Sequence, residues 1–366
     1  MESHPLPIEA LESLNNWCNT AGGGRLRNMK TRFTHSYADI ISIENLLMAW
    51  REFSRGKGMK SDVANFSLNC MAHIIQLHTD LASGSYQHGP YESFSINDTK
   101  PRSIHKASVR DRLLHRALYR ILYPSFDRTF IADSFSCREG KGTHKALNRF
   151  RSFAYEVSKN HTQTCWVLKC DIKKFFASIH HERLNTLLSK RIADERILGL
   201  CSNVIESFHT APKRGLPLGN LTSQLFANVY LDPFDQWMKH TKKTHHYLRY
   251  ADDFAILSFD REELTALIDP IRDFLSSTLA LSIHEDKVSV KTFTSGVDFL
   301  GWVHFPDHRV LRSVTKRRMF TRLAQTSKEE SLQSYLGLLS HGNTQKISHC
   351  IRHSMEVELT NPINLL

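Results

Sequence analysis

Long apolar segments are missing from this sequence. No run approaches the ~18 apolar residues that a membrane-spanning helix requires. The N-terminal stretch MESHPLPIEALESL opens with an acid and lacks the apolar core of a secretory signal. The seven cysteines are scattered and form no CxxC pair, which argues against a disulfide framework or a zinc site. We therefore expect a cytoplasmic protein with no membrane partner.

Acidic residues are the minority among the charged ones. The 366-residue chain has 48 Lys and Arg against 37 Asp and Glu, a formal charge of +11. Such a surplus favours a polyanionic partner. Nucleic acid is the first candidate, and an acidic membrane is the weaker one because no basic amphipathic segment stands alone. With 41% apolar residues, the chain can form two or three sub-domains around real cores.

Hydrophobic periodicity predicts a mixed helix and strand protein. Helices are expected from Asp39 onward and at residues 61–83, 108–122, 143–158, 181–191, 194–208, 220–239, 260–278 and 313–353. Strands are expected within 91–106, at 164–171, on both sides of a tight turn in 246–258, near 281–284 and as a hairpin across 290–305. Pro124 is expected to end the helix at 108–122.

Two adjacent acids, Asp252 and Asp253, occupy the tight turn between the β-prone segments HHYLR and FAILSF. Side-by-side acids at the tip of an apolar hairpin are costly unless a cation neutralises them. A third acid, Asp171, ends the apolar strand that begins near Trp166, a position where sites are often built. Taken singly, the pair also fits an ordinary surface turn and Asp171 a helix cap.

Taken together, strand-end carboxylates on a basic protein indicate phosphoryl transfer. Two hard cations held ~3.5–4 Å apart by shared carboxylates stabilise the attacking and leaving oxygens. That chemistry needs no covalent nucleophile, and the sequence offers no convincing one. Residues 214–224 add a glycine-containing turn before a helix, where backbone can approach a nucleotide closely.

The order of these motifs resembles the palm of reverse transcriptases. The series runs DIKKFF (171–176), GLPLGNLTSQLFANVYLDPFD (215–235), RYADDF (249–254) and GVDFLGW (296–302). KPRSIHKASVRDRLLHRAL (100–118) and DSFSCREGKGTHKAL (133–147) resemble fingers-side motifs of the group II intron-like branch. The resemblance implies an α+β right-hand polymerase with fingers, an antiparallel palm sheet and a helical thumb. Its expected parts are a basic extension (1–35), fingers and palm (36–302), and thumb with C-terminal tail (303–366).

Within that branch, the chain is most similar to reverse transcriptases of diversity-generating retroelements. The similarity lies in LGNLTSQ (218–224), in IISIENLLMAWREFSRGK (40–57) with SGSYQHGPYESF (83–94), and in GVDFLGWVHFPDHRVLR (296–312) with SYLGLLSHGN (334–343). It implies a bacterial or phage-encoded RNA-directed DNA polymerase that makes adenine-mutagenic cDNA from a template-repeat RNA. The cDNA would diversify a target gene, and a small basic accessory variability protein is the implied partner.

The resemblance assigns the metal chemistry to four residues. Asp171 and Asp252 would hold two Mg²⁺ ions with help from the carbonyl of Ile172. Asp253 would support the site electrostatically or as a weaker ligand. Lys287, in HEDKVSV, matches a lysine near the leaving pyrophosphate and could donate a proton to it.

The resemblance also implies a site for the incoming dNTP. Lys100 and Arg102 match residues that hold the triphosphate, with a solvated hairpin face as the alternative. Phe176 matches the aromatic that excludes a ribose 2′-hydroxyl, with core packing as the alternative. Leu218 stands where high-fidelity reverse transcriptases commonly carry Gln, whose amide can position the nascent base pair. We therefore expect Leu218, with Gly219 and Gln224 in the same pocket, to contribute to adenine-directed misincorporation.

Further residues are expected to contact the template RNA or the RNA–cDNA duplex. Those implied by the palm hairpins and the basic helices are Arg110, Arg112, Tyr250, Gly301, Trp302, Lys316, Arg317 and Arg318. Two alternatives stay open. One is a related bacterial reverse transcriptase of the retron, group II-like or phage-defence type without mutagenic retrohoming. The other is a non-catalytic RNA-binding protein on a polymerase scaffold, which the intact acids disfavour.

Overall fold

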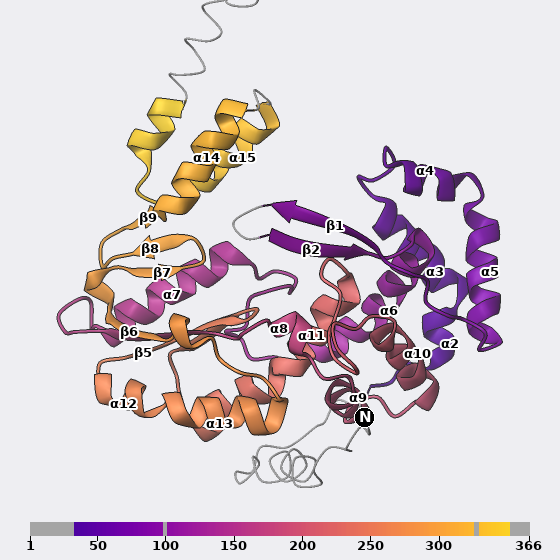
Figure 1. Cartoon of the computed structure of the whole chain (residues 1–366), viewed down its shortest axis with the longest axis horizontal. Coiled ribbons are helices and arrows are strands. Elements are labelled where there is room, and N and C mark those ends of the chain that lie inside the picture. Colours follow the sequence, from indigo (N-terminus) through magenta and orange to yellow (C-terminus); the bar gives the residue numbers. More distant parts are fainter. Residues whose placement is uncertain (1–32, 98–100, 326–328, 352–366) are drawn as a thin grey trace, which may run out of the picture.

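The computed structural model describes residues 33–97, 101–325 and 329–351. Lys100 and nearly all of the expected basic extension lie outside these residues. The N-terminal helices gather on one side of the molecule, and the two larger sheets lie on the other with further helices above and below them (Figure 1). The N-terminal helices are α2 (Tyr37–Ile41), α3 (Ile43–Ser54), α4 (Ser61–Leu68), α5 (Cys70–Ala82) and α6 (Val109–Asp127).

The central sheet has four antiparallel strands in the order β4-β5-β3-β6. Its strands are β3 (Trp166–Asp171), β4 (Tyr247–Tyr250), β5 (Asp253–Ser258) and β6 (Ser289–Thr292). β4 and β5 are the two arms of the expected strand-turn-strand segment, and β5 pairs with β3 along the full length of both strands. The antiparallel sheet predicted from the sequence is therefore present.

Successive residues of the central strands point into two different cores. Along β5, Phe254 and Ile256 belong to the larger core, whereas Ala255 and Leu257 belong to the smaller one. The same alternation holds in β3 and β4, because neighbouring side chains of a strand lie on opposite faces of the sheet. The sheet is covered on both faces, which explains why its strands are almost continuously apolar.

Helices from distant parts of the chain cover the two faces. The larger core includes residues of α11 (Leu221–Gln236), α12 (Arg261–Ala266) and α13 (Ile268–Leu279). The smaller core includes residues of α7 (Thr143–Val157), α14 (Ser313–Gln325) and α15 (Glu329–Leu339). In Figure 1, α12 and α13 lie below the sheet, while α7 and the C-terminal helices lie above it.

A second sheet connects the central sheet to the C-terminal helices. It consists of β7 (Val297–Phe299), β8 (Trp302–His304) and β9 (Arg309–Leu311), all antiparallel. Its buried residues, among them Phe299 and Trp302, share the smaller core with α14 and α15. The predicted boundary after residue 302 falls inside β8, and that boundary stays a prediction.

A two-stranded hairpin extends from the helical side toward the sheet side (Figure 1). It pairs β1 (Glu92–Asn97) with β2 (Pro101–Lys106), as expected for residues 91–106. Three shorter helices, α8 (Phe175–Ser178), α9 (His181–Ser189) and α10 (Glu195–Glu206), follow β3 in the chain.

Several local predictions were wrong. The helix expected at 61–83 is two helices, α4 and α5, and within 290–305 only β7 and β8 form a hairpin, because β6 pairs with β3. Pro124 does not end its helix, because α6 continues to Asp127 and buries Tyr123 and Phe126, and this packing outweighs the roughly 3 kcal/mol cost of an internal proline. The helix expected at 260–278 is two helices, and Pro270 lies in the first turn of the second, where a missing N–H is tolerated. Residues 281–284 form only an isolated bridge between Ile283 and Ile172 instead of a strand.

The packing of α6 predicts a clear stability contrast between two leucines. Leu118 is fully buried in the larger core, whereas Leu68 at the end of α4 is 81% exposed. We expect Leu118→Ala to lower the free energy of unfolding by about 2–5 kcal/mol, because it removes buried methyl groups and leaves a cavity. Leu68→Ala should change it by less than about 0.5 kcal/mol. Urea unfolding of both variants checks this, and equal losses would contradict the assignment of α6 to the core.

Candidate active site

Three acids from two distant regions meet where β3 and β5 pair. The antiparallel register sets Asp171 opposite Asp253. The backbone N–H of Ile172 donates to the carbonyl of Asp252 at 3.0 Å. Both strands are buried on both faces, so a slip of one residue would exchange every side chain between the two cores and is strongly disfavoured. The expected meeting of Asp171 with Asp252 and Asp253 therefore occurs at one end of the sheet.

The turn between β4 and β5 is as short as a hairpin allows. Tyr250 pairs with Asp253, so Ala251 and Asp252 alone form the loop. Ala251 has φ +54°, a left-handed conformation that costs a non-glycine residue about 1 kcal/mol or more. This strained loop holds Asp252 beside the paired positions of Asp171 and Asp253.

The acids repel one another in a partly buried setting. Burial raises the pKa of Asp253 to about 6, although Lys169 opposes the shift. Burial, and then the negative charge of Asp171, raise the pKa of Asp252, while the charges of Lys287 and Arg102 act in the opposite direction. Carboxylates whose pKa values are raised by each other's charge favour a bound cation.

Two lysines supply positive charge to this cluster. Lys169 of β3 lies on the same face of the sheet as Asp171, and its Nζ is 3.3 Å from Oδ2 of Asp253. Lys287 ends the 3-10 turn η2 (Glu285–Lys287), and its Nζ is 2.6 Å from Oδ1 of Asp171. Each lysine thus neutralises one of the two acids that face each other across β3 and β5.

The acids also provide the right donor atoms for a divalent metal ion. Carboxylate and carbonyl oxygens are the ligands that Mg²⁺ prefers. Oδ1 of Asp253 is buried and has no hydrogen-bond partner among the residues that the structure describes, so one oxygen of the cluster is still unsatisfied there. Within the described part of the chain, no three His, Cys, Asp or Glu side chains are already grouped as a metal site. Because Lys287 already contacts the Asp171 carboxylate, a cation bound there would compete with this lysine.

The turn at residues 215–219 is anchored to the β1–β2 hairpin. The His105 N–H donates to the carbonyl of Leu218 at 3.1 Å, and the Asn220 side chain donates to the carbonyl of His105 at 2.7 Å. Gly219 has φ +101°, and a Cβ there would lie 2.8 Å from Ile104 Cγ2. Only glycine fits this close approach. The hairpin also carries Arg102, whose charge reaches Asp252.

Phe176 adjoins the same turn. Its carbonyl accepts a hydrogen bond from the N–H of Leu216 at 2.8 Å, and its half-buried ring lies 5.3 Å from that of the buried Phe175. Leu218 and Gln224 are also half-buried. The structure thus bonds Phe176 to Leu216, two residues before Leu218 in the same turn, and the roles of Phe176 and Leu218 toward a nucleotide stay predictions.

Several residues expected to contact nucleic acid have partners within the protein. Arg110 pairs with Asp80 at 2.6 Å, and Arg112 pairs with Asp62 at 2.5 Å. The Trp302 side chain is 1% exposed, which leaves the backbone of its hairpin as the part able to touch a duplex. The Tyr250 hydroxyl bonds that of Thr143 at 3.0 Å, and the carbonyl of Gly301 accepts from the Arg312 N–H at 3.1 Å.

The basic residues of α14 remain the most accessible of the expected duplex contacts. Lys316 and Arg317 are exposed, and Arg318 is half-buried. Sequence reasoning missed two other groups, Lys169 beside Asp253 and the buried pair of Arg249 with Asp235. The available signals were a lysine inside an apolar strand and an acid at the end of an apolar helix.

A family comparison identifies the fold that presents these acids. Residues 95–304, which are 210 of the 366 residues, match the model of the reverse transcriptase (RNA-dependent DNA polymerase) family. The chain belongs to the reverse transcriptase family. This is a family of RNA-dependent DNA polymerases, which act on template RNA and generally use divalent metal ions. The predicted α+β right-hand polymerase fold with antiparallel sheets is confirmed.

Relatives place this reverse transcriptase near group II intron-encoded proteins. Protein YkfC of Escherichia coli (strain K12) is 25% identical over 306 residues, covering 72% of this chain and 77% of that protein. The group II intron-encoded protein LtrA of Lactococcus lactis subsp. cremoris is 22% identical over 369 residues, covering 80% of this chain and 59% of LtrA. The chain spans 31% of an uncharacterised 91 kDa protein in the cob intron of Schizosaccharomyces pombe, at 25% identity.

Among solved structures, apo telomerase from Candida tropicalis matches 60% of this chain and 48% of its own chain. The TM-score is 0.48 at 12% identity. None of the helices in the described ranges is long and apolar enough to cross a membrane.

The ion pair of Arg112 predicts a pH-dependent contribution to stability. Burial acts to raise the pKa of Asp62, but hydrogen bonds from Lys106 and Arg112 outweigh it and lower the pKa to about 2. A carboxyl whose pKa is lowered in the folded protein stabilises the fold when the pH lies above its ordinary pKa of 3.8. This contribution to stability is lost as the pH falls toward 2. We expect Asp62→Asn to lower the free energy of unfolding by about 1–2 kcal/mol at pH 7, and by less at pH 3.

Urea unfolding at both pH values measures this effect. Asp269→Asn is the matched control, because the Asp269 side chain is 84% exposed. An unchanged free energy of unfolding for Asp62→Asn at pH 7 would mean that Arg112 is not held by Asp62 and is available to bind RNA.

Proposed function

We propose that this reverse transcriptase copies RNA into DNA by a two-metal mechanism centred on Asp171 and Asp252. The observation that carries the proposal is the β3–β5 register, which sets Asp171 opposite Asp253 and beside Asp252 in a family of RNA-dependent DNA polymerases. Asp171, Asp252 and the carbonyl of Ile172 would hold two Mg²⁺ ions. When bound, these ions neutralise triphosphate charge and help to activate the primer 3′-hydroxyl.

The surrounding side chains have separate tasks in this proposal. Arg102 of the hairpin pairs with triphosphate oxygens through its planar guanidinium, and Lys100 would assist it. Lys287 would donate a proton to the departing pyrophosphate, and its contact with Asp171 places it at the site where this proton is needed. Asp253, paired with Lys169, would support the site electrostatically or as a weaker metal ligand.

Selection of the incoming nucleotide falls to Phe176 and the turn at residues 215–219. The ring of Phe176 excludes a ribose 2′-hydroxyl, so dNTPs are used and rNTPs rejected. Leu218, with Gly219 and Gln224, lines the pocket of the nascent base pair. A leucine offers only apolar contact where a glutamine would hydrogen-bond, so discrimination between correct and wrong bases falls.

The fingers, palm and thumb would together bind the template and primer. The proposed fingers and palm are residues 36–302, and the proposed thumb is 303–366. Lys316, Arg317 and Arg318 of α14 track the backbone of the RNA–cDNA duplex, a contact that weakens with salt. Gly301 and Trp302 shape the hairpin that supports the primer, while Arg110 and Arg112 stabilise the fingers through Asp80 and Asp62.

We further propose that the enzyme belongs to a diversity-generating retroelement. It would make adenine-mutagenic cDNA from a template-repeat RNA, together with a small basic accessory protein and structured RNA that flanks the template. This assignment rests on the LGNLTSQ turn and on the motifs at 40–57, 83–94 and 334–343. The alternative is a related enzyme of the retron, group II-like or phage-defence type. A near-repeat pair in the flanking DNA that differs mainly at adenines would decide for the first.

Loss of the carboxylate at position 252 is expected to abolish polymerisation. Asp252→Asn should lower the rate of primer extension on an RNA template by about 1,000-fold. The substitution replaces one carboxylate oxygen by an amide nitrogen and removes the negative charge that would hold the metal. Asp269→Asn serves as the exposed control and should retain the wild-type rate. Extension by Asp252→Asn within tenfold of wild type would refute the assignment of Asp252.

Substitution of Leu218 is expected to change the error spectrum. Leu218→Gln restores a hydrogen-bonding amide beside the nascent base pair, so misincorporation opposite template adenine should fall about tenfold. Leu218→Met keeps an apolar side chain of similar volume and should leave the spectrum as it is. Sequencing of cDNA made from one defined RNA template measures both, and an unchanged adenine error rate in Leu218→Gln would reject the role of Leu218.

A further inference from the structure

The strained loop between β4 and β5, formed by Ala251 and Asp252, is held in place by the buried side chain of Arg249. Nη1 of Arg249 donates to the carbonyl of Ala251 at 2.9 Å. The carbonyl of the next residue, Asp252, accepts from the Ile172 N–H at 3.0 Å. Both loop residues therefore have their carbonyls fixed, one by a side chain and one by the neighbouring strand.

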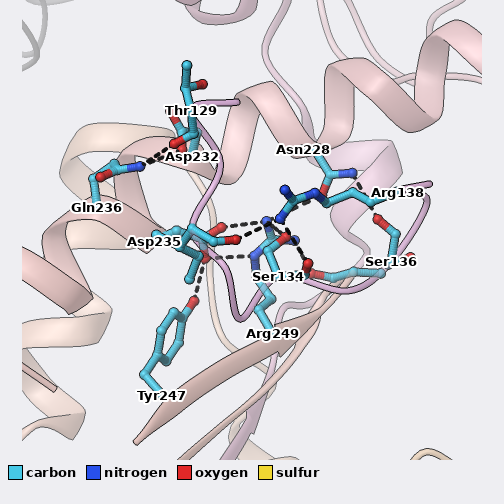
Figure 2. A network of polar contacts seen from close by, with 12 residues as sticks. Thr129, Ser134, Ser136, Arg138, Asn228, Asp232, Asp235, Gln236, Tyr247 and Arg249 are labelled. Atoms are coloured by element: carbon cyan, nitrogen blue, oxygen red, sulfur yellow. Dashed lines mark hydrogen bonds and ion pairs between the residues drawn. The ribbon is translucent and has the colours of Figure 1, made fainter. Parts of the chain in front are cut away.

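Arg249 donates through all three nitrogens of its guanidinium group. Its side chain is 1% exposed, and it donates to both carboxylate oxygens of Asp235 at 2.8 and 2.6 Å. Nη2 also donates to Ser134 Oγ at 3.2 Å and to Asn228 Oδ1 at 3.3 Å. Figure 2 shows these contacts converging on the guanidinium from separate segments of the chain.

The partners of Arg249 are themselves held in place. Asp235 is fully buried at the end of α11 and also accepts from the Tyr247 hydroxyl at 2.6 Å. The Asn228 side chain donates to the carbonyl of Ser136 at 3.0 Å. The backbone of Arg249 bonds the same segment, because its N–H donates to the carbonyl of Asp133 at 2.9 Å and its carbonyl accepts from the Phe135 N–H at 3.0 Å.

We infer that Arg249 is a positioning residue, which sets the place of the Asp252 carboxylate through the carbonyl of Ala251. The inference rests on the proposed function, in which Asp252 holds metal. Stability alone does not explain the pair, because a buried ion pair is often no more stabilising than apolar residues of similar volume. A planar fork with five N–H donors can bind Asp235, Asn228, Ser134 and Ala251 at once, which a lysine with three donors cannot.

The helix that carries Asp235 begins immediately after the turn that contains Leu218. Arg249 therefore couples the proposed base-pair pocket at one end of α11 to the aspartate loop at the other. Residues 133–136 connect to both of the elements that carry this coupling, because they bond Asn228 of α11 and the backbone of Arg249 in β4.

The test compares Arg249→Lys with Arg183→Lys in the full-length protein. Arg183 is a matched control because it is 5% exposed and donates to a single backbone carbonyl, that of Ser277, at 2.9 Å. Mn²⁺ binding is measured by the loss of the free-ion EPR signal in the absence of nucleic acid. The rate of primer extension is measured as a function of Mg²⁺ concentration.

We expect Arg249→Lys to bind Mn²⁺ about tenfold more weakly and to need a correspondingly higher Mg²⁺ concentration, while Arg183→Lys matches wild type. Adding Ala251→Gly to Arg249→Lys should recover part of the Mn²⁺ affinity, since glycine adopts the left-handed loop without strain. A purely structural role of Arg249 predicts no such recovery. Unchanged Mn²⁺ affinity and Mg²⁺ dependence in Arg249→Lys would overturn the inference.

If Arg249→Lys does not unfold cooperatively, the double variant Ser134→Ala/Asn228→Ala replaces it. This variant removes two neutral contacts of Nη2 and keeps the ion pair with Asp235, and about threefold weaker Mn²⁺ binding is expected. Wild-type affinity in a folded double variant would overturn the inference. Absence of both Mn²⁺ binding and primer extension in wild type would instead refute the proposed function itself.

Discussion

In the central sheet, β3 and β5 pair over their whole length, and this pairing places every acid of the site. The register sets Asp171 opposite Asp253, and one further hydrogen bond from Ile172 brings the loop carbonyl of Asp252 alongside. Because the sheet separates two cores, the register cannot slip without moving apolar side chains to the wrong face. The energy that holds the acids together is thus the burial of residues such as Phe254 and Val167, which have no part in the chemistry.

Holding three acids at one end of a buried sheet requires positive charge nearby. Lys169 and Lys287 each pair with one of the acids. The charge of Arg102, on the β1–β2 hairpin, acts to lower the pKa of Asp252. Within the described residues, Oδ1 of Asp253 still has no hydrogen-bond partner. If the acids hold metal as proposed, Lys169 and Lys287 would be displaced from them and could pair with the triphosphate instead.

The elements around the site are tied to it by polar contacts from within the protein. The turn containing Leu218 is bonded to the hairpin through His105 and Asn220. Arg249 bonds α11 and residues 133–136 to the aspartate loop. Trp302, in the hairpin expected to grip the primer, is buried in the smaller core, so its side chain supports that hairpin from within.

Sequence alone was sufficient to predict the polymerase family, the antiparallel sheet and the meeting of three acids at one end of it. Local hydrophobic patterns and the order of short motifs carry that information. Only the tertiary structure decided which charges meet: Arg112 pairs with Asp62, Lys287 with Asp171, and Arg249 with Asp235. Such pairs join residues far apart in the chain, and no local pattern marks one arginine as a structural brace and another as a ligand for phosphate. The continuation of α6 past Pro124 has the same cause, since burial of Tyr123 and Phe126 by distant segments outweighs a local preference.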